Sequence, residues 1–433
     1  MKRLDWNSLD ATSRARALAR PGYDTQSLRD SVAAIVERVR KGGDDALRAL
    51  TREFDGCEPE SIEVSASELT EASRNVDPSL TSAIDEAAGR IEAFHAASRP
   101  VDSELETAPG LVCRSRQVPL DTVGLYIPGG SAPLISTVLM LAIPASLAGC
   151  REVVLCTPPD GSGGIHPAIL YAAGRCGVDR VFRAGGAQAI AAMAYGTESV
   201  PRCSKLFGPG NAWVTEAKRQ AAADPAGAAQ DMPAGPSEVM VIADASADVQ
   251  SVCWDLLSQA EHGPDSQSIV ISDSDELLDG IEAMMPGLGR SLPRAEILEQ
   301  SLAHARLIRV DDLGNAVEIS NAYAPEHLIL NCGDADKLSE GIMTAGSVFV
   351  GPWTPESLGD YCSGTNHVLP TNGHARAYSG LSVADFQRRM TIQQASAEGL
   401  REAGPAAMAL AAAEGLEAHR MAVAWRLQSG EGA

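Results

Sequence analysis

Short apolar runs alternate with longer amphipathic stretches along the chain from residue 120 onward. This alternation is typical of parallel strands covered by helices. The runs that we interpret as strands span residues 123–127, 153–156, 180–182, 205–207, 239–243, 268–272, 305–310, 328–331 and 347–350. The helices expected between them include residues 211–223, 248–262, 275–285 and 313–322. So many short strands predict two α/β units in one chain.

Both ends of the chain have helical patterns instead. Residues 27–54 and 67–97 show the heptad-like apolar spacing of amphipathic helices. Residues 400–427 form an alanine-rich pattern that predicts a helical tail. Because Gly404-Pro405 and Gly415 interrupt this pattern, we expect two or three short helices rather than one rod.

One apolar segment is long enough to raise the question of a membrane span. Residues 132–150 contain no charged side chain over a length close to that of a bilayer span. Pro133 and Pro144, three hydroxyl side chains and the strand-like run at residues 152–156 favour a helix buried in an α/β layer instead. We therefore expect a core helix and no contact with membranes.

The composition indicates a globular protein in a reducing compartment. The chain has 433 residues, of which 45% are apolar and 21% are charged, enough for two or three domains. The 57 acidic residues outnumber the 35 basic ones, and the net charge of −22 opposes binding to nucleic acids and anionic membranes. Nine cysteines without a CxxC pair, and an N-terminus without an apolar signal segment, predict a cytoplasmic protein with reduced thiols.

Two short polar patterns are candidates for chemistry. Gln259 and His262 are three residues apart at the end of a predicted helix, where their side chains can converge on one target, although a solvated last turn has the same pattern. Glu326 and His327 follow Pro325 directly before an apolar run, which places them at the mouth of a strand. A carboxylate beside an imidazole can activate water and accept a proton from a hydroxyl, but an isolated pair also occurs in ordinary turns.

Further polar residues lie in the C-terminal part of the chain. Asp360 and His367 belong to a long polar stretch after the strand at residues 347–350, and a carboxylate with an imidazole suits a metal such as zinc. Glu414 and His419 are five residues apart, so one helix face cannot present both, and by themselves they resemble ordinary helix surface.

Glycine-rich turns follow three of the predicted strands. These turns are Gly129-Gly130-Ser131, Gly185-Gly-Ala-Gln188 and Gly208-Pro-Gly-Asn211. Each opens a helix, which suits the approach of a phosphate or amide group to the backbone. None of them completes the GxGxxG fingerprint of a standard dinucleotide site.

Longer motifs follow one another in order along the chain. They are Leu125-Tyr-Ile-Pro-Gly-Gly-Ser-Ala-Pro133, Gly185-Gly-Ala-Gln-Ala189, Phe207-Gly-Pro-Gly-Asn211, Asp231-Met-Pro-Ala-Gly-Pro-Ser-Glu238, Leu257-Ser-Gln-Ala-Glu-His-Gly-Pro-Asp-Ser-Gln267, Ala324-Pro-Glu-His327, and Gly359-Asp-Tyr361 with Gly364-Thr-Asn-His-Val-Leu-Pro370. Together, from about residue 23 to the tail, they closely resemble the histidinol dehydrogenase family.

The resemblance implies an NAD-dependent, four-electron oxidation of L-histidinol to L-histidine through L-histidinaldehyde, the last step of histidine biosynthesis. It also implies two incomplete Rossmann-like α/β domains with helical N-terminal and C-terminal extensions, in an intertwined homodimer. The expected division is residues 1–22 as an N-terminal extension, residues 23–125 plus 236–380 as the zinc and substrate domain, residues 126–235 as the NAD domain, and residues 381–433 as a helical tail that reaches the partner subunit.

The resemblance further implies a role for each candidate residue. The implied zinc ligands, for one ion per subunit, are Gln259, His262, Asp360 and His419. The implied catalytic residues are His327 as the general base and Glu326 as the group that activates water. Other implied substrate contacts are Ser237, His367 and Glu414, besides His327 and the zinc ligands. The implied NAD contacts are Tyr126, Gln188 and Asn211.

Two other functional classes remain as alternatives. The same ligand set suits a zinc-dependent hydrolase of a small amine substrate, with Glu326 activating a metal-bound water. A non-catalytic two-domain binding protein is the third possibility, although such proteins usually carry a secretory signal. The formation of NADH from L-histidinol and NAD⁺ distinguishes the dehydrogenase from both.

Overall fold

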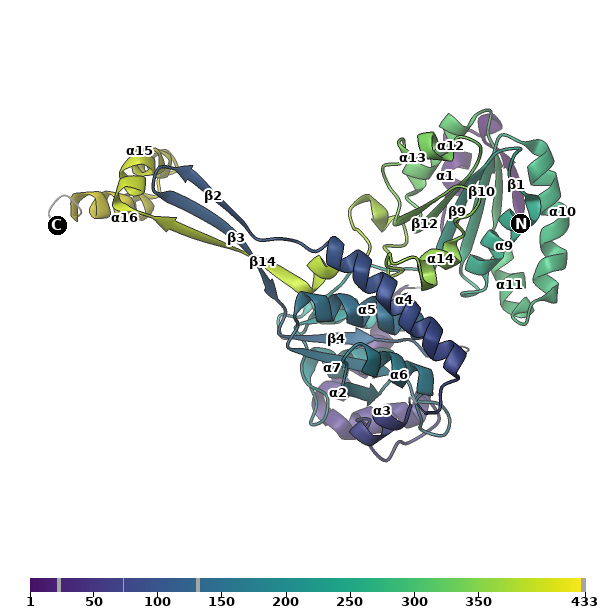
Figure 1. The fold of residues 1–433 in the computed structure, drawn as a ribbon, viewed down its shortest axis with the longest axis horizontal. Helices are drawn as coiled ribbons and strands as arrows, with labels where there is room; N and C mark the ends of the chain where they lie inside the picture. Colours follow the sequence, from purple (N-terminus) through teal and green to yellow (C-terminus); the bar gives the residue numbers. More distant parts are fainter. Residues whose placement is uncertain (22–24, 73, 130–132, 430–433) are drawn as a thin grey trace.

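The computed structural model describes residues 1–21, 25–72, 74–129 and 133–429. Two parallel sheets with helices on both faces form the body of the molecule, and a narrow arm projects from it (Figure 1). The predicted α/β class is confirmed. Each predicted strand is also present, with its ends displaced by no more than one residue, because hydrophobic runs of this kind are needed wherever a strand is buried on both faces.

Both parallel sheets have the same strand order. The order in the five-stranded sheet is β6 (Arg180–Arg183), β5 (Glu152–Thr157), β4 (Thr122–Tyr126), β7 (Lys205–Phe207) and β8 (Ala229–Gln230). The order in the six-stranded sheet is β1 (Lys2–Asp5), β11 (Arg306–Arg309), β10 (Gln267–Ser272), β9 (Glu238–Ala243), β12 (His327–Asn331) and β13 (Ser347–Val350). Numbered along the chain within each unit, both follow 3-2-1-4-5, with β1 added at one edge. This is the Rossmann order without its sixth strand, as predicted.

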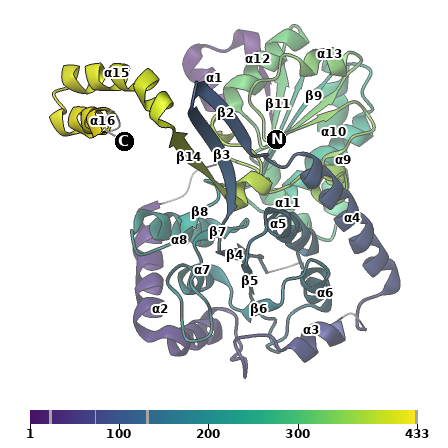
Figure 2. The ribbon, with the colours of Figure 1, turned by 60° about the vertical axis from the view of Figure 1, so that its left-hand side comes forward.

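Helices cover both faces of the five-stranded sheet (Figure 2). The helices on one face are α5 (Ile135–Ala148) and α6 (Pro167–Arg175), with α3 (Ala66–Ala72) and α4 (Pro78–Ala97) packed on them. Those on the other face are α7 (Gly186–Tyr195) and α8 (Ala212–Ala223), with α2 (Thr25–Phe54) packed on both. The uncharged segment predicted to be a core helix is α5, and its residues 137–145 are all buried. Among the described residues, no helix combines the length and the hydropathy that a membrane span requires.

The six-stranded sheet is covered in the same way. One face packs against α9 (Val249–Ala260), α10 (Asp275–Ser291) and α11 (Ala295–Leu302). The other face packs against α12 (Leu313–Tyr323) and α13 (Ala335–Ser339), together with Trp6 and Leu18 on either side of α1 (Ala11–Ala17). The remaining short elements are α14 (Glu356–Tyr361) and 3-10 helices at Trp6–Ser8, His374–Arg376 and Val383–Phe386.

The arm is a three-stranded antiparallel sheet that ends in a helical hairpin (Figure 1). Its strands, in spatial order, are β14 (Gln387–Ala395), β3 (Leu111–Pro119) and β2 (Ser103–Ala108). The hairpin at its end consists of α15 (Ala397–Ala413) and α16 (Glu417–Ser429). The strands of the arm were not predicted, because polar and apolar residues along them do not form a core-facing stripe.

The structure corrects the predicted grouping of the N-terminal helices. Residues 23–125 were expected to form one unit with residues 236–380. In the structure, however, α2, α3 and α4 pack on the helices of the five-stranded sheet, and β4 is its central strand. The apolar faces of these helices find their partners in α5 to α8, which sequence periodicity cannot specify. The N-terminal extension also contributes a strand, β1, to the six-stranded sheet.

The predicted tail differs from the structure in two respects. It was expected to be helical from residue 381, but β14 occupies residues 387–395 and pairs with β3. A helix break was also expected at Gly404-Pro405, yet α15 continues through both residues. A side chain at Gly404 would lie 3.1 Å from Val423, so this glycine permits the close contact between α15 and α16. The break at Gly415 is confirmed.

A buried ion pair fixes the turn after β7. Lys218 of α8 pairs with Asp231, and their side chains are 4% and 1% exposed. Lys218 Nζ also donates to the carbonyl oxygen of Gly208 at 2.9 Å, while the amide of Gly208 donates to Asp231 Oδ2 at 2.8 Å. The pair therefore holds both backbone groups of Gly208, the residue that opens the turn leading to Asn211.

We expect the replacement Lys218→Met to lower the free energy of unfolding by about 3–5 kcal/mol, because it leaves a buried carboxylate without its cation. Adding Asp231→Asn should restore part of this loss. The measurement is a double-mutant cycle by urea unfolding followed by circular dichroism. Asp121→Asn, which removes one partner of the exposed pair with Arg151, is the control and should leave the midpoint nearly unchanged. Strictly additive effects at the buried pair would contradict the prediction.

Candidate active site

Glu326 and His327 are held at the amino end of β12 by the first residue of β9. Ala324 adopts a left-handed conformation (φ 56°) at the end of α12, and Pro325 then directs the chain into the strand. Glu326 Oε2 accepts a hydrogen bond of 2.8 Å from the amide of Glu238. His327 Nδ1 donates to the carbonyl oxygen of Glu238 at 3.2 Å. Both backbone groups of one residue therefore orient the two side chains.

This hydrogen bond determines which imidazole nitrogen is free. With Nδ1 as the donor, Nε2 of neutral His327 carries the lone pair. Nε2 is buried and has no hydrogen-bond partner in the described chain, and it lies 3.5 Å from Asp360 Oδ1. A buried nitrogen without a partner is costly unless a bound group satisfies it. The unpartnered Nε2 beside Asp360 can bind a proton or a ligand atom placed there.

Gln259 and Glu356 complete this buried cluster. With its amide oriented for hydrogen bonding, Gln259 donates to Glu356 Oε1 at 2.6 Å and to Oε2 at 3.2 Å, and the amide nitrogen lies 3.1 Å from His327 Nδ1. The amide oxygen then faces away from Glu356. Gln259 was predicted as a site residue, but Glu356 was missed. Its burial results from the way α14 packs near α9, and one glutamate in a polar stretch gives no sign of it.

The cluster perturbs the pKa of each of its members. Burial raises the pKa of Glu326 to about 8 and raises that of Glu356 well above its usual value. Burial opposes a charged His327, but the carboxylates of Glu356, Glu326 and Asp360 outweigh it and raise the imidazole pKa to about 10. Burial also disfavours ionised Asp360, yet the adjacent His327 keeps the pKa of this carboxyl below its usual value. Within the chain alone, Glu326 and Glu356 therefore retain protons at neutral pH and His327 pairs with ionised Asp360, whereas a cation bound at Asp360 would lower the pKa values of Glu326 and His327 and leave a neutral imidazole.

The residues of this site fit a divalent metal ion. Ligand atoms of His327, Glu356 and Asp360 lie within 4.8 Å of one another. Among the predicted ligands, Gln259 is fully buried at the end of α9, and His262 follows two residues after that helix, near enough for its charge to act on Asp360. Oxygen and imidazole donors gathered in one buried cluster suit an ion such as zinc.

His419 and Glu414 are not part of this cluster. Glu414 ends α15 and His419 lies in α16, at the far end of the arm from β12 and α14 (Figure 1). Both side chains are exposed, and His419 has no hydrogen bond or ion pair within the described part of its own chain. Within the described part of a single chain, Gln259 and Asp360 lie in the cluster and His262 lies near it, whereas His419 is remote.

His367 connects the cluster to the other sheet. Its Nδ1 donates to the carbonyl oxygen of Asp360 at 2.8 Å, and its Nε2 lies 3.2 Å from Thr137 Oγ1 of α5. The neighbouring Asn366 donates to the carbonyl oxygen of Met140 at 2.7 Å. Since both ring nitrogens are engaged, His367 positions Asp360 in this structure. Ser237, the residue before Glu238, is half-buried at the amino end of β9.

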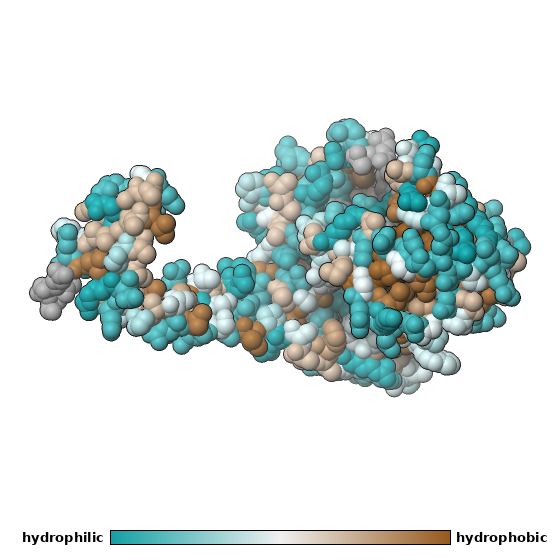
Figure 3. All heavy atoms as spheres, turned by 90° about the horizontal axis from the view of Figure 1, so that it is seen from above, coloured by the Kyte–Doolittle hydropathy of each residue, from teal (hydrophilic) through white to brown (hydrophobic). Residues whose placement is uncertain are grey.

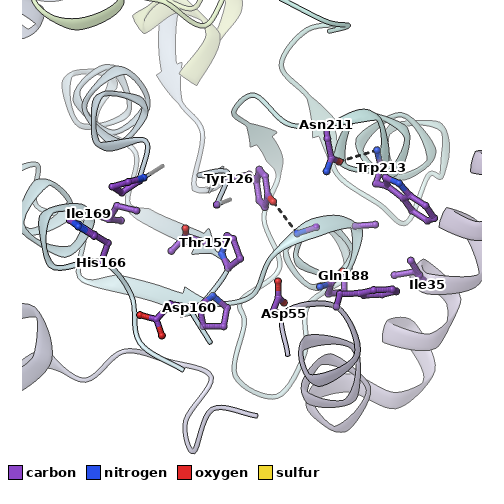
Figure 4. Close-up of a pocket in the computed structure, with 17 residues that line it drawn as sticks. Ile35, Asp55, Tyr126, Thr157, Asp160, His166, Ile169, Gln188, Asn211 and Trp213 are labelled. Carbon is purple, nitrogen blue, oxygen red and sulfur yellow. Dashed lines mark hydrogen bonds between the residues drawn. The ribbon is translucent and has the colours of Figure 1, made fainter. Parts of the chain in front are cut away.

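A separate cavity of about 720 Å³ is lined by all three predicted NAD contacts (Figure 4). Tyr126 ends β4, and its hydroxyl accepts a hydrogen bond of 2.9 Å from the amide of Gly186. Gln188 lies in the first turn of α7, and Asn211 caps α8 by accepting from the amides of Trp213 and Val214. Gly129 also lines the cavity, whereas Gly130 and Ser131 of the same predicted turn lie outside the described residues.

The two sites use opposite ends of their strands. The cavity lies at the carboxyl ends of β4, β5 and β7, as the Rossmann arrangement predicts. Glu326, His327 and Ser237 instead lie at the amino ends of β12 and β9. Glu326 and His327 were expected at a strand mouth because catalytic groups gather at carboxyl ends, whereas the structure places them at the amino end of β12. The turn after α12 brings the pair to this edge, and the pairing of β12 with β9 orients it.

Comparisons with known proteins agree along the whole chain. The sequence model of the histidinol dehydrogenase family matches residues 18–427. The histidinol dehydrogenase of Xylella fastidiosa (strain Temecula1) is 56% identical over 432 residues, covering 99% of this chain and 100% of its own. That of Vibrio vulnificus (strain YJ016) is 50% identical, with 99% of both chains covered.

A solved structure extends the agreement to the fold. The crystal structure of histidinol dehydrogenase from Elizabethkingia anophelis is 44% identical and has a TM-score of 0.95, with 100% of this chain and 99% of that chain covered. Nothing in these comparisons supports the hydrolase alternative. The chain belongs to the histidinol dehydrogenase family.

Proposed function

We propose that the buried cluster around His327 carries out the oxidation of L-histidinol to L-histidine through L-histidinaldehyde. The histidinol dehydrogenase family is NAD-dependent and zinc-binding, and it catalyses the final step of histidine biosynthesis. The observation that carries the proposal is the unpartnered Nε2 of His327 beside Asp360, with Glu326 as its neighbour. A positioned base and a second carboxyl group are what two successive oxidations at one carbon require.

His327 and Glu326 divide the proton transfers. In the first oxidation His327 accepts the hydroxyl proton of the alcohol while the hydride leaves its carbon for NAD⁺. Glu326 then takes a proton from water as that water adds to the aldehyde, while protonated His327 gives its proton to the carbonyl oxygen, and the product is the hydrate. His327 accepts a hydroxyl proton of the hydrate as the second hydride leaves for a second NAD⁺, and the resulting carboxylic acid releases its remaining proton to give the carboxylate of histidine. The hydrogen bonds to Glu238 keep both groups aimed at one carbon throughout.

The implied zinc ligands are Gln259, His262, Asp360 and His419. When bound, zinc would offset the negative charge of the cluster and hold the substrate's amino and imidazole nitrogens, without a redox role because its d shell is full. Glu356 keeps the Gln259 amide turned so that its oxygen is available. His367 fixes the backbone of Asp360, and Ser237 and Glu414 remain substrate contacts in this proposal.

We assign NAD to the cavity at the carboxyl ends of β4, β5 and β7. Tyr126, Gln188 and Asn211 line it, and its volume is in the range usual for cofactor sites. The first turn of α5 joins this cavity to the catalytic cluster, because Pro133 lines the cavity while Thr137 contacts His367. One rigid helix therefore sets the position of the cofactor relative to the substrate.

We further propose a homodimer in which the arm of one subunit completes the site of the other. Large apolar side chains are exposed on the arm and at its end (Figure 3), namely Leu105, Met390, Leu410, Leu416, Met421 and Trp425. A projecting sheet with few buried contacts needs a partner surface. The exposed Glu414 and His419 would then enter the partner's cluster. We expect the dimer to work in the cytoplasm, where its nine free thiols remain reduced.

The roles of the catalytic pair predict distinct kinetic defects. His327→Asn should lower kcat by about 10²–10⁴-fold, because the alcohol loses its proton acceptor. Glu326→Gln should impair hydration of the aldehyde, so that the NADH formed per histidinol consumed falls from two toward one. The absorbance of NADH gives kcat, and the NADH formed is compared with the histidine measured by chromatography to give the stoichiometry. Glu340→Gln, at an exposed position at the end of α13, is the control. Wild-type turnover in His327→Asn would exclude the proposed base.

The metal site predicts a dependence on zinc. Dialysis against a chelator should abolish turnover, and added Zn²⁺ should restore it. Elemental analysis should find about one zinc per subunit in the purified enzyme and much less in His262→Asn, which loses a ligand. His304→Asn should retain its zinc, because this histidine lies outside the cluster. Full activity after complete removal of the metal would disprove the assignment.

Shared sites predict complementation between defective subunits. His262→Asn and His419→Asn should each be inactive alone. Random pairing makes half of the dimers mixed, and each mixed dimer has one intact site, so co-expression should restore about a quarter of wild-type activity. His262→Asn paired with Asp360→Asn is the control, since both changes lie in the body of the subunit and should not complement. Absence of recovery in the first pair would indicate that each site forms within one chain.

A further inference from the structure

Three polar atoms in the wall of the cavity have no hydrogen-bond partner in the described chain. They are Asp55 Oδ2, Thr157 Oγ1 and Gln188 Nε2, and all three are buried atoms of cavity-lining residues. Gln188 itself is only 2% exposed. Buried polar groups without partners are uncommon and costly, so a wall with three of them is suited to a ligand that has its own hydroxyl and amide groups.

Asp55 lies where dinucleotide-binding folds of this strand order place an acidic residue. In dinucleotide-binding folds, an acidic residue near the carboxyl end of the second strand binds a ribose hydroxyl. The second strand here is β5, and Thr157, Pro158 and Pro159 follow at its end instead of a free carboxylate. Asp160 comes next, but its Oδ1 already accepts from the amides of Ser162 and Gly164.

Asp55 reaches the same place from a different element. It follows α2, which packs outside α7 and α8. A Cβ atom built on Gly185 would lie 2.5 Å from Pro158 Cβ and 3.2 Å from Asp55 Oδ1, so the carboxylate lies beside the end of β5. Figure 4 shows the Asp55 side chain between Thr157 and Gln188. The missing carboxylate of the second strand is thereby supplied from outside the α/β unit.

The charge of the cavity wall distinguishes between dinucleotides. Asp55 and Asp160 are its acidic residues, and the described lining contains no lysine or arginine. A 2′-phosphate on the adenosine ribose needs a cation close by, and it would meet a carboxylate here instead. A free 2′-hydroxyl, in contrast, can donate to that carboxylate.

We propose that Asp55 is the residue that selects NAD over NADP, by accepting a hydrogen bond from a ribose hydroxyl and repelling a 2′-phosphate. The inference rests on the proposed function, since it requires that NAD occupies this cavity. It adds a specificity-determining residue that the motifs of the sequence did not indicate, because Asp55 lies in the turn after α2, away from the glycine-rich turns that follow the predicted strands.

Direct binding tests this role. Titration of the purified enzyme with NAD⁺ or NADP⁺, followed by fluorescence of the cavity-lining Trp213 or by calorimetry, gives both dissociation constants. Asp55→Asn should weaken NAD⁺ binding about tenfold and raise the NADP⁺/NAD⁺ affinity ratio by tenfold or more, because a charged acceptor is lost. Glu58→Gln, which removes an exposed carboxylate three residues away, is the matched control and should change neither constant. Asp55→Ser should have the same effect as Asp55→Asn. It takes the place of Asp55→Asn if that variant does not fold.

The outcomes separate this inference from the proposed function. If Gln188→Ala weakens NAD⁺ binding while Asp55→Asn and Asp55→Ser leave the NADP⁺/NAD⁺ ratio unchanged, the role of Asp55 is wrong and the NAD site stands. If Gln188→Ala, Asn211→Ala and Asp55→Asn all leave NAD⁺ affinity unchanged, the cavity is not the NAD site and both proposals fail there. A raised ratio in the Asp55 variants alone supports the inference.

Discussion

The parallel pairing of β12 with β9 is the constraint on which the catalytic site depends. It places His327 beside Val239, so the amide and carbonyl of Glu238 face the side chains of Glu326 and His327. Glu238 is itself fixed, because its buried carboxylate accepts from Arg20 Nη2 at 2.9 Å and from the amide of Asn372 at 2.9 Å. The strand pairing that forms the sheet therefore also orients the imidazole of His327. The close grouping of Glu326, Glu356 and Asp360 around one imidazole is then a property of the folded site.

The two sheets contribute different parts of one reaction, and α5 sets their relation. The five-stranded sheet offers a neutral to acidic cavity without a glycine fingerprint, whereas the six-stranded sheet offers a buried cluster of acids and imidazole. Hydrogen bonds from His367 and Asn366 to α5 connect the cluster of the six-stranded sheet to the five-stranded sheet. Because these contacts are hydrogen bonds between buried groups, small displacements of the cluster relative to the cavity are opposed.

The sequence was sufficient for the elements that bury a continuous apolar face, and insufficient where burial depends on distant partners. All the strands predicted in the α/β region exist because their hydrophobic runs are needed in any parallel sheet. The strands of the arm escaped prediction because their side chains are largely exposed within one subunit. The metal and catalytic candidates came from motif resemblance, whereas Glu356 and Asp55 lack any motif. Glu356 is distinguished by its burial and Asp55 by an unpartnered buried oxygen, and both features exist only in the folded chain.

The two parallel sheets share a strand order but differ in where their functional residues lie. Both units arrange five strands in one pattern, yet one unit uses the carboxyl ends of its strands and the other uses the amino ends. Equivalent positions in the two halves therefore share a need for hydrophobicity and nothing else. Chemical residues such as Asn211 and His327 have no counterparts to match. One strand order can thus support two different kinds of site, because it sets which strands are neighbours but not which edge of the sheet carries the chemistry.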